Sequence, residues 1–588
     1  MDSKHVTEST SGQEDIQKTW WKEAIIYQIY PRSFQDSDGD GIGDLNGITS
    51  RLDYIQSLGV DIIWLNPIFL SPNDDNGYDI SDYREIMREF GTMEDFDRLL
   101  KEIHKREMRL VLDLVVNHTS DEHPWFEEAR KSRHNPYYNY YHWWPAEKGE
   151  PPLRLSYFDE EGNAWTYNKP TDSYYLHYFS RKQPDLNWEN PEVRQEIFDM
   201  MRFWFDKGID GFRMDSISLI AKDPSFPLID SKKYPDIFSF YAKEPRLHLY
   251  LHEMNRQVLS KYDCMSVGEG SAVMVDDVAK FVDPAREELN MLYHFDAARI
   301  RNTTLPDNLE SGIDYSLIAL KKMFTEWDKA VDKGWPSIYL GNHDQPRMVS
   351  RFGSDKDEFR ALSAKMLITF LLTMRGTPYW FAGDEIGMRN IRFDRIEDYN
   401  DIDTINRYKK AKAEGKDPQA VLDEQKETGR DNARTPFQWD RSPEAGFTAG
   451  TPWLKVNPDY TWINVADEEK DPTSILNYFK KVVSFRKENP SLIYGSYHLL
   501  DAENPQSYTF LRKTGADTYL IMLNFSPKAA ISTPGIDMSN AHVLLDNYGD
   551  RSHMAPQKDI TLRPFEAIVF QLNHPVYESF IDSLDLLE

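Results

Sequence analysis

Short apolar runs alternate with amphipathic stretches along most of this chain, and that alternation limits the folds it can adopt. Seven runs have the length and composition of buried strands: 25–30, 62–65, 109–116, 211–214, 265–267, 337–340 and 378–381. Helical periodicity lies between them, as in residues 93–106 and 191–207. Repeated strand–helix units imply a parallel sheet with helical crossovers. The pattern favours an α/β barrel, with an eighth strand expected within 464–492 or hidden in an irregular segment.

Uneven spacing between these units predicts insertions and a separate C-terminal domain. Residues 118–183 are rich in Tyr, Trp, Asn and Pro and are too long for a connecting loop, so we expect an inserted domain there. A charged helical stretch, 402–427, lies within a second expected insertion. Short alternating strands beyond residue 504 predict an all-β domain. The expected division is a disordered polar leader (1–18), a barrel (19–117 and 184–504), an inserted domain (118–183) and a C-terminal domain (505–588).

Charge and cysteine content exclude several classes of partner. The chain carries 97 Asp and Glu against 69 Lys and Arg, a formal net charge of −28, which repels nucleic acid and anionic membranes. Cys264 is the sole cysteine, so no intrachain disulfide can form. No run approaches the roughly 18 apolar residues of a membrane span. We expect a cytoplasmic monomer with neither a nucleic-acid nor a membrane partner.

Three acids stand at or just beyond the ends of predicted strands. They are Asp215, Glu269 and Asp344; Arg213 lies two residues before the first and His343 directly before the last. In parallel barrels, catalytic residues come from the C-terminal ends of different strands. Glycoside hydrolysis commonly uses two carboxyl groups that flank the glycosidic bond. These acids therefore indicate a candidate active site.

A second acidic pattern resembles a calcium loop. The candidate oxygen ligands are Asp36, Asp38, Asp40, the carbonyl of Ile42, and Asp44. Gly41 stands where such a loop turns sharply, but the twelfth position is Gly47 rather than a bidentate Glu. We expect a structural Ca²⁺, or Mg²⁺, of modest affinity, and no organic cofactor.

The order and spacing of several motifs resemble those of the α-amylase family of glycoside hydrolases, family 13. The four short regions of that family are matched by residues 113–118, 211–215, 268–269 and 342–344. Residues 183–187 (QPDLN) and 430–436 (RDNARTP) are similar to segments of its oligo-1,6-glucosidase and α-glucosidase branch. The resemblance runs from about residue 20 to the C-terminus. It implies a (β/α)₈ TIM barrel, a B domain inserted after strand 3, and a C-terminal β-sandwich.

The same resemblance implies roles for individual residues. Asp215 would be the nucleophile, Glu269 the general acid and then base, and Asp344 the third acid. The implied substrate-binding residues are Tyr78, Asp79, His118, Phe179, Gln183, Arg213, Ser216, His343 and Arg430. We expect Arg213 to keep Asp215 ionised. Glu269 follows an apolar strand and faces two acids, so we expect it to be the protonated partner.

The resemblance points to exo-acting release of glucose from a small oligosaccharide or disaccharide. Ser216 and Gly270, beside the nucleophile and the acid, depart from the residues common in α-1,6-acting relatives, so linkage stays open among maltose, isomaltose and sucrose types. Sucrose isomerisation is the alternative, because residues 295–302 share the Phe-Asp pair and one Arg of the isomerase signature. A catalytically inactive binding relative is a remote alternative, since all three acids are present.

Overall fold

Eight parallel strands form the central sheet of the computed structural model, which describes residues 18–158, 162–234, 236–300, 315–515, 517–552 and 558–572. In chain order the strands are β1 (Ile26–Ile29), β2 (Ile62–Leu65), β5 (Arg109–Val115), β9 (Gly211–Asp215), β10 (Met265–Glu269), β11 (Met291–Tyr293), β12 (Ser337–Ile338) and β13 (Thr377–Phe381). Their hydrogen-bonded order is β11-β10-β9-β5-β2-β1-β13-β12. The Ser337 hydroxyl donates to the Leu292 carbonyl at 2.6 Å, which links the two end strands. The predicted α/β barrel is confirmed.

The eighth strand is β11, which lies in an irregular segment as one of the two alternatives expected, and not within 464–492. That segment forms α16 (Val465–Glu468) and α17 (Ile475–Glu488), and it ends in α18 (Ser491–Tyr494). On α17 the buried apolar residues recur at helical spacing, as Ile475, Phe479 and Val482 do. β11 has only three residues, too few for its apolar run to stand out in the sequence.

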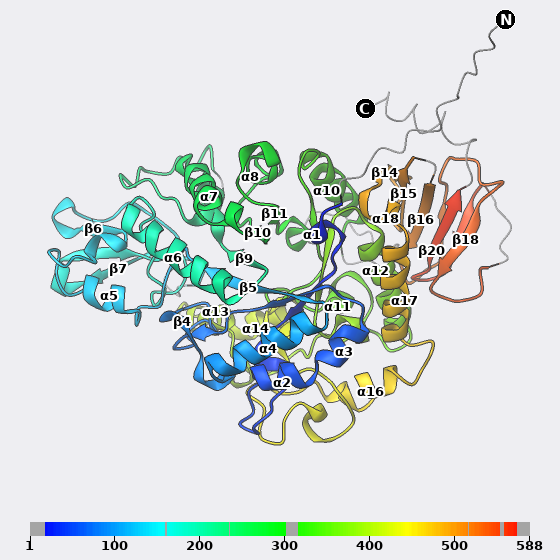
Figure 1. Cartoon of the computed structure of the whole chain (residues 1–588), viewed down its shortest axis with the longest axis horizontal. Coiled ribbons are helices and arrows are strands. Elements are labelled where there is room, and N and C mark those ends of the chain that lie inside the picture. Colours follow the sequence, from blue (N-terminus) through cyan, green and yellow to red (C-terminus); the bar gives the residue numbers. More distant parts are fainter. Residues whose placement is uncertain are drawn as a thin grey trace, which may run out of the picture.

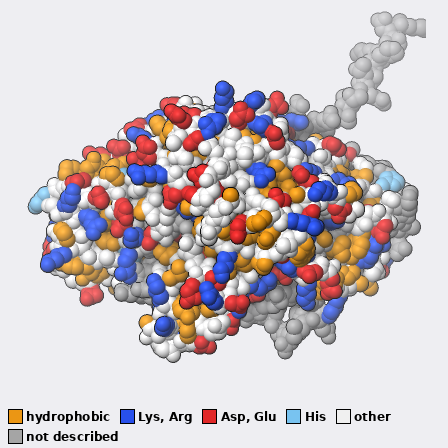
Figure 2. Space-filling model, turned by 90° about the horizontal axis from the view of Figure 1, so that it is seen from below, with side chains coloured by type: hydrophobic (Ala, Val, Ile, Leu, Met, Phe, Trp, Pro, Cys, Tyr) orange, Lys and Arg blue, Asp and Glu red, His pale blue; other side chains and the backbone are white. Residues whose placement is uncertain are grey.

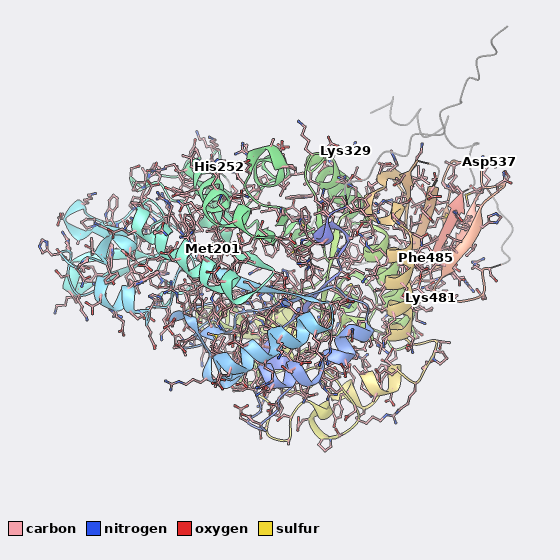
Figure 3. The ribbon with its side chains drawn as sticks, in the orientation of Figure 1. Met201, His252, Lys329, Lys481, Phe485 and Asp537 are labelled. Atoms are coloured by element: carbon pink, nitrogen blue, oxygen red, sulfur yellow. The ribbon has the colours of Figure 1, made fainter. Side chains whose placement is uncertain are left out.

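Helices follow the strands and cover the outside of the barrel (Figure 1). The longest are α4 (Met93–Lys105), α6 (Pro191–Lys207), α7 (Arg246–Gln257), α10 (Leu317–Ala330), α12 (Arg360–Thr373) and α17. α4 begins in a capping box formed by Thr92 and Asp95. Met201 of α6 is buried, whereas Lys329 of α10 and Lys481 of α17 lie on exposed faces (Figure 3). No helix among the described residues combines the length and hydropathy that a bilayer crossing requires.

The other helices, most of them shorter, connect these elements. They are α1 (Trp20–Glu23), α2 (Leu45–Ser50), α3 (Leu52–Ser57), α5 (Pro124–Ala129), α8 (Ala279–Val282), α9 (Asp296–Arg299), α11 (Met348–Phe352), α13 (Ile402–Ala413), α14 (Pro418–Thr428) and α15 (Asp431–Arg434). The charged stretch at 402–427 thus forms two helices, α13 and α14, broken at a turn around Gly415, whose φ is +70°. Of the predicted leader, only Lys18 lies within the described residues.

The insertion after β5 contains its own small sheet. Its strands are β6 (Trp143–Pro145), β7 (Trp165–Asn168) and β8 (Ser173–Leu176), antiparallel in the order β6-β8-β7. A two-stranded pair, β3 (Phe69–Leu70) and β4 (Asp82–Ile86), follows β2. The inserted sheet projects from one end of the molecule, at the left of Figure 1. Its last segment returns to the barrel through bridges that pair His118 with Asp185 and Tyr141 with Leu186.

Antiparallel strands form the C-terminal region, at the opposite end of the molecule (Figure 1). The main sheet, in spatial order, is β14 (Ser496–Leu500), β15 (Ser507–Thr514), β16 (Asp517–Asn524), β20 (Ala567–Leu572) and β18 (His542–Asp546). A second pair is β17 (Ala530–Ser532) with β19 (Ile560–Leu562). Leu520, Ile560 and Phe570 belong to one buried cluster that joins the two sheets. Because β14 pairs with β15, this region starts before the predicted boundary at residue 505.

Two buried arginines bind carbonyls around the end of α12, and one of them, Arg512, joins the C-terminal sheet to the barrel. Arg486 donates to the carbonyls of Leu372, Met374, Gly376 and Leu492. Arg512 of β15 donates to another set of carbonyls, including that of Thr373 at the end of α12. α12 has buried residues around its whole circumference, because it lies between the barrel and this sheet (Figure 1). On the face shown in Figure 2, acidic and basic side chains are interspersed.

Candidate active site

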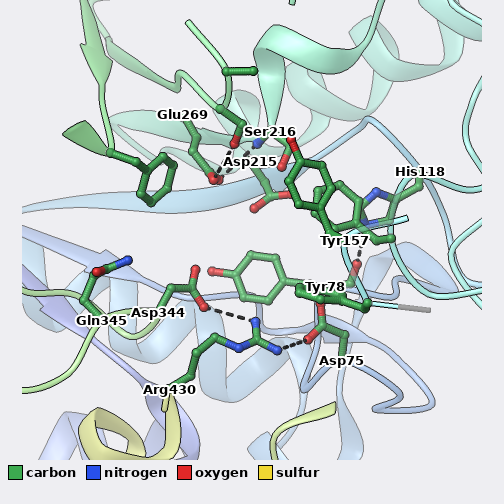
Figure 4. Close-up of a pocket in the computed structure, with 15 residues that line it drawn as sticks. Asp75, Tyr78, His118, Tyr157, Asp215, Ser216, Glu269, Asp344, Gln345 and Arg430 are labelled. Carbon is green, nitrogen blue, oxygen red and sulfur yellow. Dashed lines mark hydrogen bonds and ion pairs between the residues drawn. The ribbon is translucent and has the colours of Figure 1, made fainter. Parts of the chain in front are cut away.

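The predicted acids meet at one cavity of about 310 Å³, within the usual range for small-molecule sites. Asp215 ends β9, Glu269 ends β10, and Asp344 follows β12. The lining residues are Asp75, Tyr78, His118, Tyr157, Phe158, Phe179, Asp215, Ser216, Glu269, Ser271, Ala272, Phe295, Asp344, Gln345 and Arg430. Figure 4 shows Asp215 and Glu269 on one side of the cavity, facing Asp344 and Arg430 on the other.

Arg213 connects three carboxylates beneath this cavity. One terminal nitrogen donates to Asp113 at 2.8 Å and to Asp215 at 2.9 Å, and the other donates to Glu269 at 2.5 Å. Arg213 is only 1% exposed and does not line the cavity. A single planar guanidinium therefore holds the carboxyl groups of Asp215 and Glu269 side by side.

The pair of acids is electrostatically coupled. Burial and the neighbouring Glu269 carboxylate raise the pKa of Asp215 well above its ordinary value, although Arg213 acts in the opposite direction. Since Arg213 donates to both carboxyls, it does not keep Asp215 ionised in preference to Glu269, as the sequence suggested. The proton of such a pair belongs to both groups together.

The surroundings of Asp344 lower its pKa, in contrast to those of Asp215. Its carboxylate accepts hydrogen bonds from Arg434 at 2.8 Å and Arg430 at 3.3 Å, and lies 3.1 Å from His343 Nε2. Burial alone would raise the pKa of Asp344, but His343 and the two arginines outweigh it and hold the pKa well below its usual range. Burial also lowers the pKa of His343. The two guanidiniums therefore supply the positive charge that persists at neutral pH.

His343 supports Tyr78 and Asp344 from below the cavity. Its Nδ1 accepts a hydrogen bond from the Gln28 amide at 2.8 Å, which leaves the proton on Nε2. That nitrogen lies 2.7 Å from the Tyr78 hydroxyl, and the two rings stack with centroids 5.3 Å apart. The Tyr78 hydroxyl in turn donates to Asp113 at 2.9 Å. His343 is fully buried, so it orients groups that face the cavity without facing it.

Asp75, rather than the predicted Asp79, presents its carboxylate to the cavity. Asp79 is fully buried and accepts the main-chain N–H groups of Asp74 at 2.8 Å and Asp75 at 3.0 Å. Burial raises the pKa of Asp79 to about 7 and that of Asp75 to about 6. Asp75 pairs with Arg430 at 3.2 Å. The turn at Asn76 and Gly77, both with positive φ, sends the two acids to different places, which the sequence alone does not reveal.

Gln183 and His118 form a support behind Asp75. The Gln183 amide donates to Asp75 at 3.3 Å and lies 3.2 Å from His118 Nε2. Gln183 is fully buried and does not line the cavity. Burial lowers the pKa of His118 to about 3, so its ring is neutral and donates to the Tyr78 carbonyl at 2.9 Å. His118 does line the cavity, as predicted.

Aromatic side chains form one wall of the site. Phe179 and Tyr157 stack with ring centroids 5.1 Å apart, and the Arg430 guanidinium lies 4.7 Å from the Phe158 ring centroid. Phe179 was predicted, but Tyr157 and Phe158 were not, because the inserted domain shows no periodic pattern in its sequence. Gln345, which directly follows Asp344, was not predicted either. Phe295, from the pair discussed for isomerases, also lines the cavity. Residues 301 and 302 of that segment lie outside the described residues.

The acidic loop brings three of its predicted ligands together. Carboxylate oxygens of Asp36, Asp38 and Asp40 lie within 4.8 Å of one another, and carboxylate oxygens are the kind of ligand that a hard cation such as Ca²⁺ takes. Asp44 is not in this group of three; it caps α2, accepting the Gly47 N–H at 2.7 Å. The Ile42 N–H donates to Asp40 at 2.8 Å, and a ligand role for the Ile42 carbonyl stays a prediction.

Gly41 allows the acidic loop to pack closely against a neighbouring segment. Its φ is +94°, and a Cβ there would lie 1.8 Å from the Thr451 carbonyl oxygen. A side chain is therefore excluded at this position, as the sharp turn expected from the sequence requires.

Comparisons with known proteins identify the family. The model for the alpha-amylase catalytic domain matches residues 28–495. An oligo-1,6-glucosidase of Parageobacillus thermoglucosidasius is 51% identical over 568 residues, covering 95% of this chain and all of the relative. One from Bacillus cereus is 49% identical over 567 residues, with the same coverage. The solved trehalulose synthase from Pseudomonas mesoacidophila is 42% identical, with a TM-score of 0.89 over 94% of this chain and 99% of that one.

The barrel and the acids at its rim, together with these relatives, define a glycoside hydrolase. The chain belongs to the alpha-amylase family.

Proposed function

We propose that this protein is an exo-acting, retaining α-glucosidase that releases glucose from the non-reducing end of short α-glucosides. The observation that carries the proposal is the pair Asp215 and Glu269, held by Arg213 at the rim of the barrel. Closely spaced carboxyl groups suit retention, in which one acts as nucleophile and the other as acid and base. The oligo-1,6-glucosidase relatives support the same substrate class.

Exo action is supported by the far side of the cavity. Arg430 spans it, pairing with Asp75 at 3.2 Å and with Asp344 at 3.3 Å. Asp401 holds the other edge of the same guanidinium at 2.7 Å. These ion pairs leave room for a terminal sugar ring but obstruct a glucan chain that would continue beyond it. Asp75 and Asp344 can accept hydrogen bonds from the hydroxyls of that ring.

The mechanism needs one proton on the coupled acids. The glycosidic oxygen takes the proton from Glu269 while Asp215 attacks the anomeric carbon, so the leaving sugar departs as an alcohol and a glucosyl ester forms. Glu269, now ionised, removes a proton from water, which attacks the same carbon and frees Asp215. Arg213 contacts both carboxyl groups during both steps, and the ionised Asp344 accepts hydrogen bonds from the ring hydroxyls.

Product analysis tests the proposal. Glucose release is measured from isomaltose, maltose, sucrose, trehalose and longer glucans, with trehalose 6-phosphate included because a trehalose-6-phosphate hydrolase of Bacillus subtilis is 43% identical. Proton NMR of the first product should detect α-glucose. Asp215→Asn should abolish release, and Asp79→Asn serves as a carboxylate control outside the cavity. First-formed β-glucose, or full activity of Asp215→Asn, would refute the mechanism.

Sucrose isomerisation is the second candidate. A variant of the trehalulose synthase has been crystallised with the substrate sucrose, and Phe295 lines the cavity here. Trehalulose or isomaltulose as the main product from sucrose would favour this alternative over hydrolysis.

A structural Ca²⁺ in the acidic loop is also part of the proposal. Asp36, Asp38 and Asp40 would hold the ion and so join the loop to Thr448, whose hydroxyl donates to Asp36. An ion that binds the folded state and not the unfolded chain stabilises the fold, and the stabilisation grows with the logarithm of the ion concentration above Kd. Chelation with EDTA should lower the melting temperature, and added Ca²⁺ should restore it in the wild type but not in Asp38→Asn. Mg²⁺ is compared in the same assay.

A further inference from the structure

The two oxygens of the Glu269 carboxyl group have different partners. Oε2 faces two nitrogen donors, a terminal nitrogen of Arg213 at 2.5 Å and the main-chain N–H of Ser216 at 3.1 Å. Oε1 accepts a hydrogen bond from the Ser271 hydroxyl at 3.0 Å, and the Asp215 carboxyl also interacts with the Glu269 carboxyl. Ser271 lines the cavity.

This asymmetry locates the proton of the acid. Arginine and main-chain nitrogens donate and cannot accept, so a proton on Oε2 would face two other protons. When Glu269 carries the proton of the coupled pair, that proton therefore resides on Oε1. A serine hydroxyl both donates and accepts, so Ser271 can accept from the protonated acid and, after rotation, donate to the carboxylate.

We propose that Ser271 is a positioning residue that holds Oε1 of Glu269 in both protonation states of the acid–base cycle. The inference rests on the proposed function, because it assumes that Glu269 is the acid and base. When Glu269 gives its proton to the departing sugar, the Ser271 hydroxyl turns to donate to the new carboxylate. When Glu269 takes a proton from the attacking water, the hydroxyl becomes the acceptor again.

The main chain around Ser271 is held on both sides. The Ser218 hydroxyl donates to the Ser271 carbonyl at 2.6 Å, and the Gly270 N–H donates to the Tyr293 carbonyl at 2.7 Å. A Cβ on Gly270 would lie 2.9 Å from that same carbonyl oxygen and 2.8 Å from a Leu292 methyl carbon. The tight turn after β10 therefore places the hydroxyl beside Oε1, on the cavity side of Glu269.

Three variants test the role: Ser271→Ala, Ser271→Cys and Ser271→Thr. The bond to the carboxylate is charge-assisted and stronger than the bond to the neutral acid, so its loss stabilises the protonated form. In Ser271→Ala, the basic limb of the pH profile of kcat/KM on isomaltose should move to higher pH, and kcat should fall about tenfold. An aryl α-glucoside, whose leaving group needs little protonation, should lose less. Ser271→Thr should restore both values, and Ser271→Cys, a weak donor, should be intermediate.

The outcomes separate this inference from the proposed function. An unmoved basic limb in Ser271→Ala, or equal losses in Ser271→Ala and Ser271→Thr, would overturn the role of the hydroxyl. Should Ser271→Ala fail to fold, the limb position in Ser271→Cys relative to Ser271→Thr decides the question. Full activity of Glu269→Gln on isomaltose would instead refute the assignment of the acid itself.

Discussion

Asp75 and Asp79 are four residues apart, yet replacement by asparagine should lower chiefly the activity at Asp75 and chiefly the stability at Asp79. Asp75 is buried at the cavity wall, where it pairs with Arg430 and accepts from Gln183. Asp75→Asn would keep the shape of the side chain but lose the charge that a sugar hydroxyl meets. Hydrogen bonds to charged groups contribute about 1.5–3 kcal/mol, so kcat/KM should fall about ten- to a hundredfold.

Asp79→Asn should act on stability. Each carboxylate oxygen of Asp79 accepts one main-chain N–H, from Asp74 and from Asp75. Asparagine keeps one acceptor oxygen and directs its amide NH₂ at the other N–H, which leaves a buried donor unpaired. The free energy of unfolding should decrease by about 1–3 kcal/mol. Because the side chain does not reach the cavity, kcat/KM should change much less than in Asp75→Asn.

Initial rates on isomaltose and urea unfolding of both variants measure the two effects. Asp79→Asn should unfold at a clearly lower urea concentration than the wild type, and Asp75→Asn should show the larger loss of kcat/KM. The reasoning fails if Asp79→Asn loses more kcat/KM than Asp75→Asn while both unfold together. That result would mean that Asp79, as first expected from the sequence, contacts the substrate.

Four further results are expected. Glu269→Gln should lower kcat on isomaltose by about 10²–10⁴-fold, the usual contribution of a general acid, but lower it less on an aryl α-glucoside. The pH profile of wild-type kcat/KM should be bell-shaped, since the Asp215–Glu269 pair must hold one proton. The basic limb reports the loss of that last proton from the pair, and the raised pKa of Asp215 indicates that it lies well above the range of an ordinary carboxyl. A single sigmoid would contradict this prediction. Arg486→Met removes the side-chain donor from the buried carbonyls of Leu372, Met374 and Gly376, so urea unfolding should show a loss of at least about 2 kcal/mol; the Leu492 carbonyl still accepts from Arg512. Gly41→Ala should lower the melting temperature, because its Cβ would overlap the Thr451 carbonyl, whereas Gly39→Ala meets no atom and provides a comparison at similar φ.

Elements with a strong local signal were predictable. α6 begins and ends where the sequence indicated, because Pro191 occupies its first position and Gly208 adopts the left-handed conformation after it. Asp215 and Glu269 were predictable as well, since each ends an apolar run and parallel strands bring such ends to one rim. The three-residue strand β11 was not, because its neighbours in the barrel, rather than its length, determine its conformation.

Local pattern in the sequence was enough to predict the barrel, the positions of its acids along the chain and the family to which the chain belongs. Which groups face the substrate emerged only from the folded molecule. Asp75 enters the cavity and Asp79 does not, because the turn at Gly77 reverses the chain between them. Arg213 reaches both acids rather than one. The partner of each carboxylate depends on distances between side chains far apart in sequence, and these distances cannot be inferred from the local sequence pattern.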